Sequence, residues 1–529
     1  MAVADGLERK LLLFAVLSRC LLIVLQIIFN NLIPNYDADV FNPPTKVDSS
    51  HPSGALDYVV ETTLCGLNRW DAIYFIHIAE HGYIYQNSLA FFPLFPFLVK
   101  FIANTFCYIL QFVLIYRNVI LVSAVICNVT FFALSVILLF RLGRNVLDNC
   151  YTAYKACLLF CINPASIFMV ASYSETLYFF CVLYGLYYLE SSRKMLTVFM
   201  FALSSLARSN GLLNIGFILY ESFTFLGMTL RSFFSGISIT KMTAKMWAFR
   251  IFTFFNIVLA QLTYLFISVV LFLVPFILYQ IYYVNEIFCK IDTSTLSAIP
   301  DYLVTYGLNR GYHIIGDSIP PWCNLTIPLS YSYIQSSHWG VGFMKYYELK
   351  QIPNFLLAVP VTVLSVGCVW CYFKWNRRTC LTLGMESDIT AIKKNDGERR
   401  CLWNNSRLLP YVVHILMLTL FGWMFIHIQV LTRMLFSSSP ILYWFAAYCT
   451  TDETKTQVTI RNEYDVIRPR EDIYKVGKEE NLQHSLKNIL TDQIINFSTQ
   501  SFVSKLILCY FLFYFTVGTF MFCNFLPWT

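Results

Sequence analysis

Residues 69–96, which begin RWDAIYFIHIAEHGY, gather the side chains best suited to chemistry, and they lie between two strongly apolar runs. They include Asp71, His77, Glu80 and His81. Ionisable groups at a membrane edge cost free energy, so they are candidates for function. A carboxylate at the mouth of an apolar cavity can take a proton from a substrate hydroxyl as a general base. Asp71 can equally cap the helix-like segment that follows it, and spacing alone leaves both roles open.

Two short patterns resemble metal sites. His77, Glu80 and His81 match H-x-x-E-H, in which two histidines four positions apart share a helix face and could bind zinc. The helical pattern stops directly after His81, and no later glutamate stands out as a third ligand. Hydrogen bonding at a membrane edge is the competing interpretation. Asp37 and Asp39 form the D-x-D of metal-dependent nucleotide-sugar enzymes, but this tripeptide is common and a solvated loop explains it as well.

Polar residues also interrupt apolar runs further along the chain. Arg208 and Asn210 break the run 196–222. This pattern predicts an interrupted helix whose freed backbone and arginine face a cavity rather than lipid. His427 and Arg433 lie at the boundary of two other apolar runs. Arg433 is there either a snorkelling anchor or a phosphate ligand.

The stretch 320–354 is rich in Tyr, Trp, His and Gln, including Gln335 and His338. Aromatic planes and amides are groups that proteins use to hold sugars. Lys345, Lys350 and His338 could meet a phosphate. The same composition is typical of the aromatic belt at a membrane interface, so both interpretations stay open.

The composition indicates a membrane protein. Of the 529 residues, 57% are hydrophobic and only 13% are charged, whereas soluble domains carry roughly 25% charged residues. Such a chain must present apolar side chains to lipid as well as to its own core. The net charge of +7 comes mostly from short loops, which favours membrane topology over nucleic-acid binding. We expect an all-α polytopic protein, one integral membrane domain over 1–529, with about nine to eleven transmembrane helices.

Loop charges predict the sidedness of the chain. The N-terminus is expected in the cytosol, and the sequon at Asn324 favours an exoplasmic position for its loop. The expected segments are a first exoplasmic loop at 31–91, a second at 288–352, a cytosolic loop at 375–407 and a polar, partly disordered insertion at 451–500. Residues 141–155 look cytosolic, although simple alternation of spans would place them outside. Either a segment near 92–115 is re-entrant or the charge rule fails there.

Cysteines are scattered, and many lie inside apolar runs, where they act as small buried hydrophobic residues. Cys65, Cys289 and Cys323 fall in expected exoplasmic loops and could pair, but the spacing does not say which two would do so.

Several long blocks of the chain together resemble the PIG-V family, mannosyltransferases that add the second mannose in GPI-anchor assembly. They run from near residue 68 to the C-terminus, leaving out 375–407 and 451–500. The blocks are RWDAIYFIHIAEHGY with AFFPLFP, NPASIFMVASYSET, LARSNGLLN, PLSYSYIQSSHWGVGFMKYYELKQIPNFLLA, HIQVLTRMLFSSSPILYWF and CNFLPWT.

The resemblance implies a multi-pass endoplasmic reticulum enzyme of the GT-C class, whose lumenal loops form the active site. The donor would be dolichyl-phosphate mannose, and the acceptor a GPI precursor that already bears one mannose. The family's tryptophan–aspartate pair falls on Trp70 and Asp71. Asn35, Asp37 and Asp39 lie where GT-C enzymes often carry an acidic pair. No metal, nucleotide or other cofactor is implied.

The implied chemistry is a single inverting displacement, because a β-linked donor would give an α-linked product. It needs one base on the acceptor hydroxyl and cations near the departing phosphate. Asp71 fits the base, and Arg208, Lys350 and Arg433 are candidate phosphate partners. The other candidate substrate-binding residues are Trp70, Glu80, His81, Asn210, Gln335, His338 and His427.

Three other functions remain open at this point. A polytopic transporter or scramblase would move a substrate without covalent change. A membrane zinc protease would use His77, Glu80 and His81. Another dolichol-linked mannosyltransferase, acting on N-glycans, would differ only in its acceptor. The sequence leaves open whether a small membrane partner subunit exists.

Overall fold

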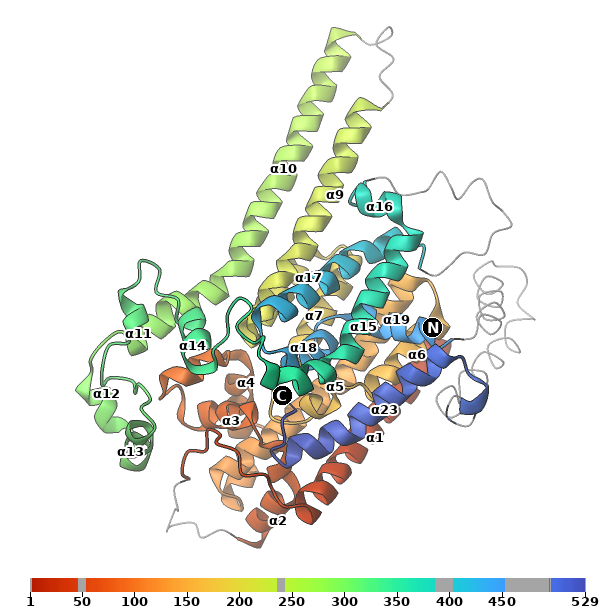
Figure 1. Cartoon of the computed structure of the whole chain (residues 1–529). Coiled ribbons are helices and arrows are strands. Elements are labelled where there is room, and N and C mark those ends of the chain that lie inside the picture. Colours follow the sequence, from red (N-terminus) through yellow and green to blue (C-terminus); the bar gives the residue numbers. More distant parts are fainter. Residues whose placement is uncertain are drawn as a thin grey trace.

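The computed structural model describes residues 2–45, 54–235, 243–385, 403–451, 494 and 496–528. Within these ranges the chain is helical, with no β structure beyond two isolated bridges, so the all-α prediction is confirmed (Figure 1). Most of the loops expected at 375–407 and 451–500 lie outside the described residues.

The helices are α1 (Ala2–Leu32), α2 (Ala55–Leu64), α3 (Asp71–His81), α4 (Leu94–Asn104), α5 (Tyr116–Leu147), α6 (Cys150–Cys161), α7 (Glu175–Glu190), α8 (Lys194–Ala207), α9 (Ile215–Phe234), α10 (Ala244–Ile277), α11 (Val284–Phe288), α12 (Thr293–Ala298), α13 (Asp301–Asn309), α14 (Ser330–Trp339), α15 (Ile352–Trp375), α16 (Arg377–Leu381), α17 (Leu409–Phe425), α18 (Leu431–Phe436), α19 (Pro440–Cys449) and α23 (Phe502–Cys523).

Seven segments of the described chain are long and apolar enough to cross a membrane, which confirms the polytopic prediction. Many of their apolar side chains are exposed, as lipid contact requires; Phe252 and Phe266 of α10 are 68% and 69% exposed. Three further apolar helices, α4, α8 and α19, are shorter. The seven segments are Gly6–Leu32, Tyr116–Leu147, Ser209–Phe234, Ala244–Phe288, Leu349–Trp375, Ser406–Phe425 and Phe502–Cys523.

Contacts between helix ends define two faces of the molecule. Arg141, near the end of α5, forms an ion pair with Glu8 at 2.7 Å. Arg407, at the start of α17, donates to the carbonyl of Asn145 and pairs with Glu190 at the end of α7. We call this side the N-terminal face. The other ends of α1 and α23 meet on the far face, where the Tyr36 N–H donates to the Asn524 carbonyl.

This arrangement resolves the conflict over residues 141–155 in favour of a re-entrant segment. The region 92–115 does not cross the molecule: α4 has 11 residues and is followed by the turn Tyr108–Phe112. The chain therefore stays on the far face between α1 and α5. The first loop, 31–91, is also more structured than a polar loop, because it contains α2 and α3.

Several apolar stretches form pairs of short helices that stop inside the protein. Helix α6 has 12 residues and α7 has 16, about 18 and 24 Å at 1.5 Å per residue, against a hydrocarbon core of roughly 30 Å. Both have one end on the N-terminal face, so their junction lies in the interior. The predicted interruption of 196–222 is present: α8 ends at Ala207, and a 3₁₀ segment, Ser209–Asn214, leads into α9. Neither of the apolar stretches 154–172 and 175–190 therefore forms a separate span.

The interior helix ends persist because neighbouring side chains satisfy their freed backbone groups. Arg19 of α1 is buried and donates to the carbonyls of Cys161 and Ser166. Asn128 of α5 donates to the carbonyls of Ala171 and Tyr173. These contacts fix the segment between α6 and α7, which the sequence motif NPASIFMVASYSET occupies.

Candidate functional site

A strained turn places Asp71. The Ala72 N–H donates to the Arg69 carbonyl at 3.1 Å, and Trp70 between them has φ +55° and ψ −126°. This conformation matches the second position of a type II′ turn, where glycine is usual. A non-glycine residue there costs of order 1–3 kcal/mol and is found mainly at functional sites. The turn therefore fixes the direction of Asp71 at the start of α3.

The turn is held by both ends of the chain. Arg69 donates to Asn30 at the end of α1 and to the carbonyl of Cys523 at the end of α23. The rings of Trp70 and Phe525 pack edge to face with centroids 5.8 Å apart. Helices α1 and α23 lie side by side (Figure 1), so they form one wall behind the turn.

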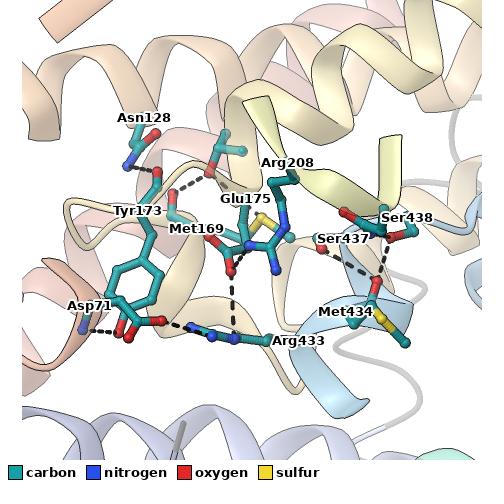
Figure 2. Close-up of polar contacts among 12 residues, drawn as sticks. Asp71, Asn128, Met169, Tyr173, Glu175, Arg208, Arg433, Met434, Ser437 and Ser438 are labelled. Atoms are coloured by element: carbon teal, nitrogen blue, oxygen red, sulfur yellow. Dashed lines mark hydrogen bonds and ion pairs between the residues drawn. The ribbon is translucent and has the colours of Figure 1, made fainter. Parts of the chain in front are cut away.

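Asp71, whose side chain is 25% exposed, belongs to a largely buried cluster of four charges. Its Oδ2 lies 2.7 Å from Nη2 of Arg433 in α18. The Nε of Arg433 lies 3.7 Å from Glu175, the first residue of α7, and Arg208 forms an ion pair with the same carboxylate. Figure 2 shows Arg433 reaching both carboxylates and Arg208 contacting Glu175. We call Asp71, Glu175, Arg208 and Arg433 the charge cluster; two carboxylates and two guanidinium groups balance within it.

Three interior helix ends supply this cluster. Glu175 begins α7, Arg208 follows the last residue of α8, and Arg433 lies in the short helix α18. Exposed fractions of the side chains are 0% for Glu175, 17% for Arg208 and 10% for Arg433. A snorkelling anchor needs its charged head in water, so that interpretation of Arg433 is wrong. Charges this buried are found in pairs, as they are here.

The cluster is braced by hydroxyl and amide groups. The backbone N–H of Asp71 donates to the Tyr173 hydroxyl at 3.1 Å, and the guanidinium of Arg433 lies 5.4 Å from the centres of the Tyr173 and Phe168 rings. Asn210 donates to the hydroxyl of Ser438 at 2.9 Å, joining the α8 interruption to the segment after α18. The predicted residues Arg208, Asn210 and Arg433 are thus brought together with Asp71.

Arg433 has an unsatisfied edge and lines a small cavity. Its buried Nη1 has no hydrogen-bond partner among the described residues. The cavity is lined by apolar and aromatic groups with a few polar ones: Phe168, Leu357, Gln429, Thr432, Arg433, Tyr514 and Trp528. A buried, unpartnered guanidinium N–H is costly, so this edge is suited to an anionic ligand.

An aromatic cluster begins one helical turn beyond Asp71. The Tyr74 ring is stacked between Phe41 and Phe91, with centroid distances of 4.1 and 4.4 Å. Trp339, the last residue of α14, packs against Tyr74 and Phe91, and Tyr312 packs against Phe41. We call these five residues the aromatic cluster. Burial raises the pKa of the Tyr74 hydroxyl, and nearby Tyr312 and Asp71 raise it further.

Two predicted residues of α14 lie beside this cluster. His338 is exposed and its ring lies 6.5 Å from that of Tyr312; Gln335 is half-buried. Although the residue as a whole is exposed, partial desolvation of its ring, with a contribution from His313, lowers the pKa of His338; this favours the neutral imidazole, which can exchange hydrogen bonds with hydroxyl groups. Tyr331 of the same helix shares a hydrogen bond with Ser209, 2.7 Å apart, which ties α14 to the α8 interruption.

The H-x-x-E-H residues form a separate polar group on α3. Nε2 of His81 lies 3.5 Å from Glu80, and the rings of His77 and His81 are 5.1 Å apart. Burial lowers the pKa of His81 to about 4, helped by Arg117 and Lys100, and raises the pKa of Glu80. Among the described residues there is no group of three or more His, Cys, Asp or Glu side chains that could hold a metal ion.

Other predicted residues lie apart from the charge cluster. Lys350 is exposed and pairs with Glu348 at 2.7 Å. His427 stacks on Tyr346 with ring centroids 4.5 Å apart, on the segment that leads to α18. Lys345 donates to Ser336.

The first and second far-face loops hold the D-x-D residues and the disulfide. Asp37 and Asp39 are exposed, and Asp39 pairs with Arg310 at 2.6 Å, as in a solvated loop. Of the three cysteines that could pair, Cys289 and Cys323 form a disulfide and Cys65 is free.

Sequence reasoning missed Glu175 and Tyr173. Both lie in NPASIFMVASYSET, a block noticed only for its resemblance. The signal was available for Glu175, because a carboxylate within a long apolar region is a functional candidate by default. Nothing in the spacing indicated that it would meet Arg433.

Comparisons with known proteins show which family the chain resembles over its length. The family model described as "Mannosyltransferase (PIG-V)" matches residues 8–529. The GPI alpha-1,6-mannosyltransferase 2 of Rattus norvegicus is 38% identical over 100% of both chains, and that of Homo sapiens is 37% identical over 99% of both. The GPI mannosyltransferase 2 of Drosophila pseudoobscura pseudoobscura is 34% identical over 83% of this chain and 90% of its own length.

Proposed function

The chain belongs to the PIG-V family of mannosyltransferases, and on that premise we propose that it adds the second mannose of a GPI precursor, in α-1,6 linkage, from dolichyl-phosphate mannose. The predictions of a multi-pass membrane protein and of a glycosyltransferase of GPI-anchor assembly are confirmed. The donor, the inverting course, the lumenal side and the roles of individual residues belong to the proposal.

One observation carries the proposed mechanism: the carboxylate of Asp71 touches the guanidinium of Arg433, and the aromatic cluster starts at Tyr74, one turn away on α3. A transferase that moves a sugar from a lipid phosphate to a sugar hydroxyl needs a base, a cation for the phosphate and a surface for the acceptor sugar. These three groups meet around residue 71.

In the proposed reaction, the 6-hydroxyl oxygen of the acceptor mannose attacks C1 of the donor mannose. The C1–O bond to the phosphate breaks, and the dolichyl phosphate departs with the electron pair. The proton of the attacking hydroxyl passes to Asp71. A phosphate is a good leaving group, so the step needs little general acid, and general-base assistance contributes about 10²–10⁴-fold. A β-linked donor then gives the α-linked product.

The donor phosphate is assigned to Arg433. Its unpartnered Nη1 and the cavity beside it support this assignment. The lining beside Arg433, which includes Phe168, Leu357 and Tyr514, is mostly apolar and aromatic, and this favours a phosphate carried on a lipid over a fully polar ligand. Arg208 adds a second positive charge to the same cluster through Glu175.

The acceptor glycan is assigned to the aromatic cluster. Trp339 and Tyr312 are half-buried, and His338 beside them is exposed. Flat rings with nearby neutral hydrogen-bonding groups are suited to the apolar faces and hydroxyls of sugars. Gln335 lies on the same helix, α14.

No metal or cofactor takes part in the proposal, because the guanidinium of Arg433 can stabilise the charge on the departing phosphate. Transfer should therefore persist in excess EDTA, whereas an intramembrane zinc protease would lose its activity. The proposed compartment is the endoplasmic reticulum membrane, with the far face in the lumen. The Cys289–Cys323 disulfide supports this side, because disulfides persist in oxidising compartments.

A rescue experiment tests the proposal. Wild type and Asp71→Asn are expressed in cells that lack their second GPI mannosyltransferase, and surface GPI-anchored protein is read by flow cytometry. Asp292→Asn is the matched control, because Asp292 is an exposed helix cap whose side chain accepts from the Ser294 N–H. At equal protein levels, wild type and Asp292→Asn should restore the surface signal and Asp71→Asn should not. Failure of the wild type would contradict the proposed function.

A further inference from the structure

We propose that Glu175 is a positioning residue that anchors Arg433, so that an arriving donor phosphate can take the arginine from Asp71 and release Asp71 to act as base. This inference rests on the proposed function, and it adds a role for a residue that contacts neither sugar.

The resting contacts conflict with catalysis as they stand. Asp71 must accept a proton, yet its Oδ2 already accepts a charge-assisted hydrogen bond from Arg433 at 2.7 Å. While the guanidinium occupies this oxygen, the oxygen is not available to the proton of an acceptor hydroxyl. The base therefore becomes effective only when Arg433 finds another anion.

The unsatisfied edge of Arg433 offers a binding position for the donor phosphate. Its Nη1 is buried and has no hydrogen-bond partner among the described residues, and Arg433 lines the cavity assigned to the donor. A phosphate entering this cavity can bind Nη1 and then compete with Asp71 for Nη2, because a guanidinium binds phosphate through parallel N–H groups. The donor phosphate and Asp71 are then alternative partners of one side chain.

Glu175 holds the side chain of Arg433 in place while its partner changes from Asp71 to the phosphate. Its carboxylate is fully buried, lies 3.7 Å from the Nε of Arg433, and also pairs with Arg208. It thus lies near a different nitrogen of the guanidinium from the one that Asp71 contacts, and it can retain Arg433 in place while the other nitrogens change partner. Arg208 neutralises the charge that Glu175 brings to the interior. Donor binding should therefore precede productive binding of the acceptor.

A double variant separates positioning from stability. Glu175→Gln leaves the charge cluster with one uncompensated arginine, so it is expected to reduce the amount of folded protein. Glu175→Gln combined with Arg208→Gln restores the charge balance, but it does not restore the anchor for Arg433. Wild type, both variants and Glu175→Asp are purified in detergent or assayed in microsomes at equal protein levels, with dolichyl-phosphate mannose and a mono-mannosylated GPI acceptor each varied in turn.

The expected result is a recovered protein level in the double variant with a loss of at least tenfold in kcat/KM for the donor beyond the loss in Arg208→Gln alone, measured alongside, while the acceptor KM stays within twofold of wild type. Glu175→Asp should recover part of the donor kcat/KM. A double variant with wild-type kcat and donor KM would overturn the inference and leave Glu175 a structural residue. If the wild type transfers no mannose in the same assay, the proposed function itself fails, so the two failures are distinguishable.

Discussion

Arg433 and Asp71, which lie near opposite ends of the chain, contact each other through a 2.7 Å ion pair in the interior. The pair is possible because α7, α8 and α18 have ends inside the protein, where a continuous transmembrane helix would present only apolar side chains. The interrupted helices therefore bring charge to the place where a lipid phosphate would have to be bound.

Replacing Arg433 should damage both stability and transfer. Removing one partner of a buried pair typically costs about 3–5 kcal/mol, because the remaining charge is left uncompensated. Arg433→Gln should therefore lower the thermal midpoint in detergent and abolish transfer, while Arg433→Lys keeps the charge and should recover part of the stability. The matched control is Arg310→Gln, which breaks the exposed pair with Asp39 and should cost roughly 0–1 kcal/mol. Equal effects of the two glutamine variants would contradict the buried role of Arg433.

The backbone conformation at Trp70 predicts an unusual order of stability for two variants at this position. Trp70→Gly and Trp70→Ala both lose the ring, but only glycine adopts φ +55° without steric cost. The free energy of unfolding should therefore be about 1–2 kcal/mol higher for the glycine variant than for the alanine variant. The control is Trp370, inside helix α15, where glycine should be less stable than alanine by about 1 kcal/mol. Thermal unfolding of the four proteins measures both differences, and the same sign at both sites would contradict the strained turn.

The aromatic cluster predicts a selective loss of acceptor binding. Trp339→Ala should raise the acceptor KM about tenfold, the scale of one lost aromatic contact of roughly 1.4 kcal/mol, with the donor KM little changed. Trp370→Ala is the control, because its ring is 66% exposed on the apolar surface of α15. Initial rates with each substrate varied in turn give both KM values. A rise in donor KM alone would place the acceptor elsewhere.

The disulfide predicts both a stability difference and a side of the membrane. Cys289–Cys323 closes a loop with a sequence separation of 34 residues, for which loop closure gives about 3–4 kcal/mol. Cys289→Ser should lower the thermal midpoint and shift mobility on a non-reducing gel, whereas Cys65→Ser should do neither, because Cys65 is free. Thiol labelling that finds both Cys289 and Cys323 reduced in cells would contradict a lumenal far face.

Part of this site was predictable from sequence because its residues break strong patterns. Asp71, Arg208 and Arg433 are ionisable residues beside or within apolar runs. The interruption at 206–214 was predictable for the same reason, because polar residues break an apolar run there. The all-α polytopic fold follows from composition for the same physical reason, the cost of exposing polar groups to lipid.

The remaining features depend on distances that sequence spacing does not contain. The sequence does not indicate that α6 and α7 stop in the interior, because Arg19, which satisfies the freed carbonyls between them, is far away in sequence. Glu175 meets Arg433 only after three interior helix ends converge. Lys350 showed the same charge as Arg433, yet it lies on the surface beside Glu348.

The most direct test of the central claim is mannose transfer by the purified protein. Wild type and Asp71→Asn receive labelled dolichyl-phosphate mannose and a mono-mannosylated GPI acceptor, and the product is digested with a linkage-specific α-1,6-mannosidase. Wild type should give a product that the enzyme cleaves, and Asp71→Asn should be slower by at least about 10², the lower range of general-base assistance. A variant that transfers at the wild-type rate would contradict Asp71 as the base, and a product resistant to the mannosidase would contradict the proposed linkage.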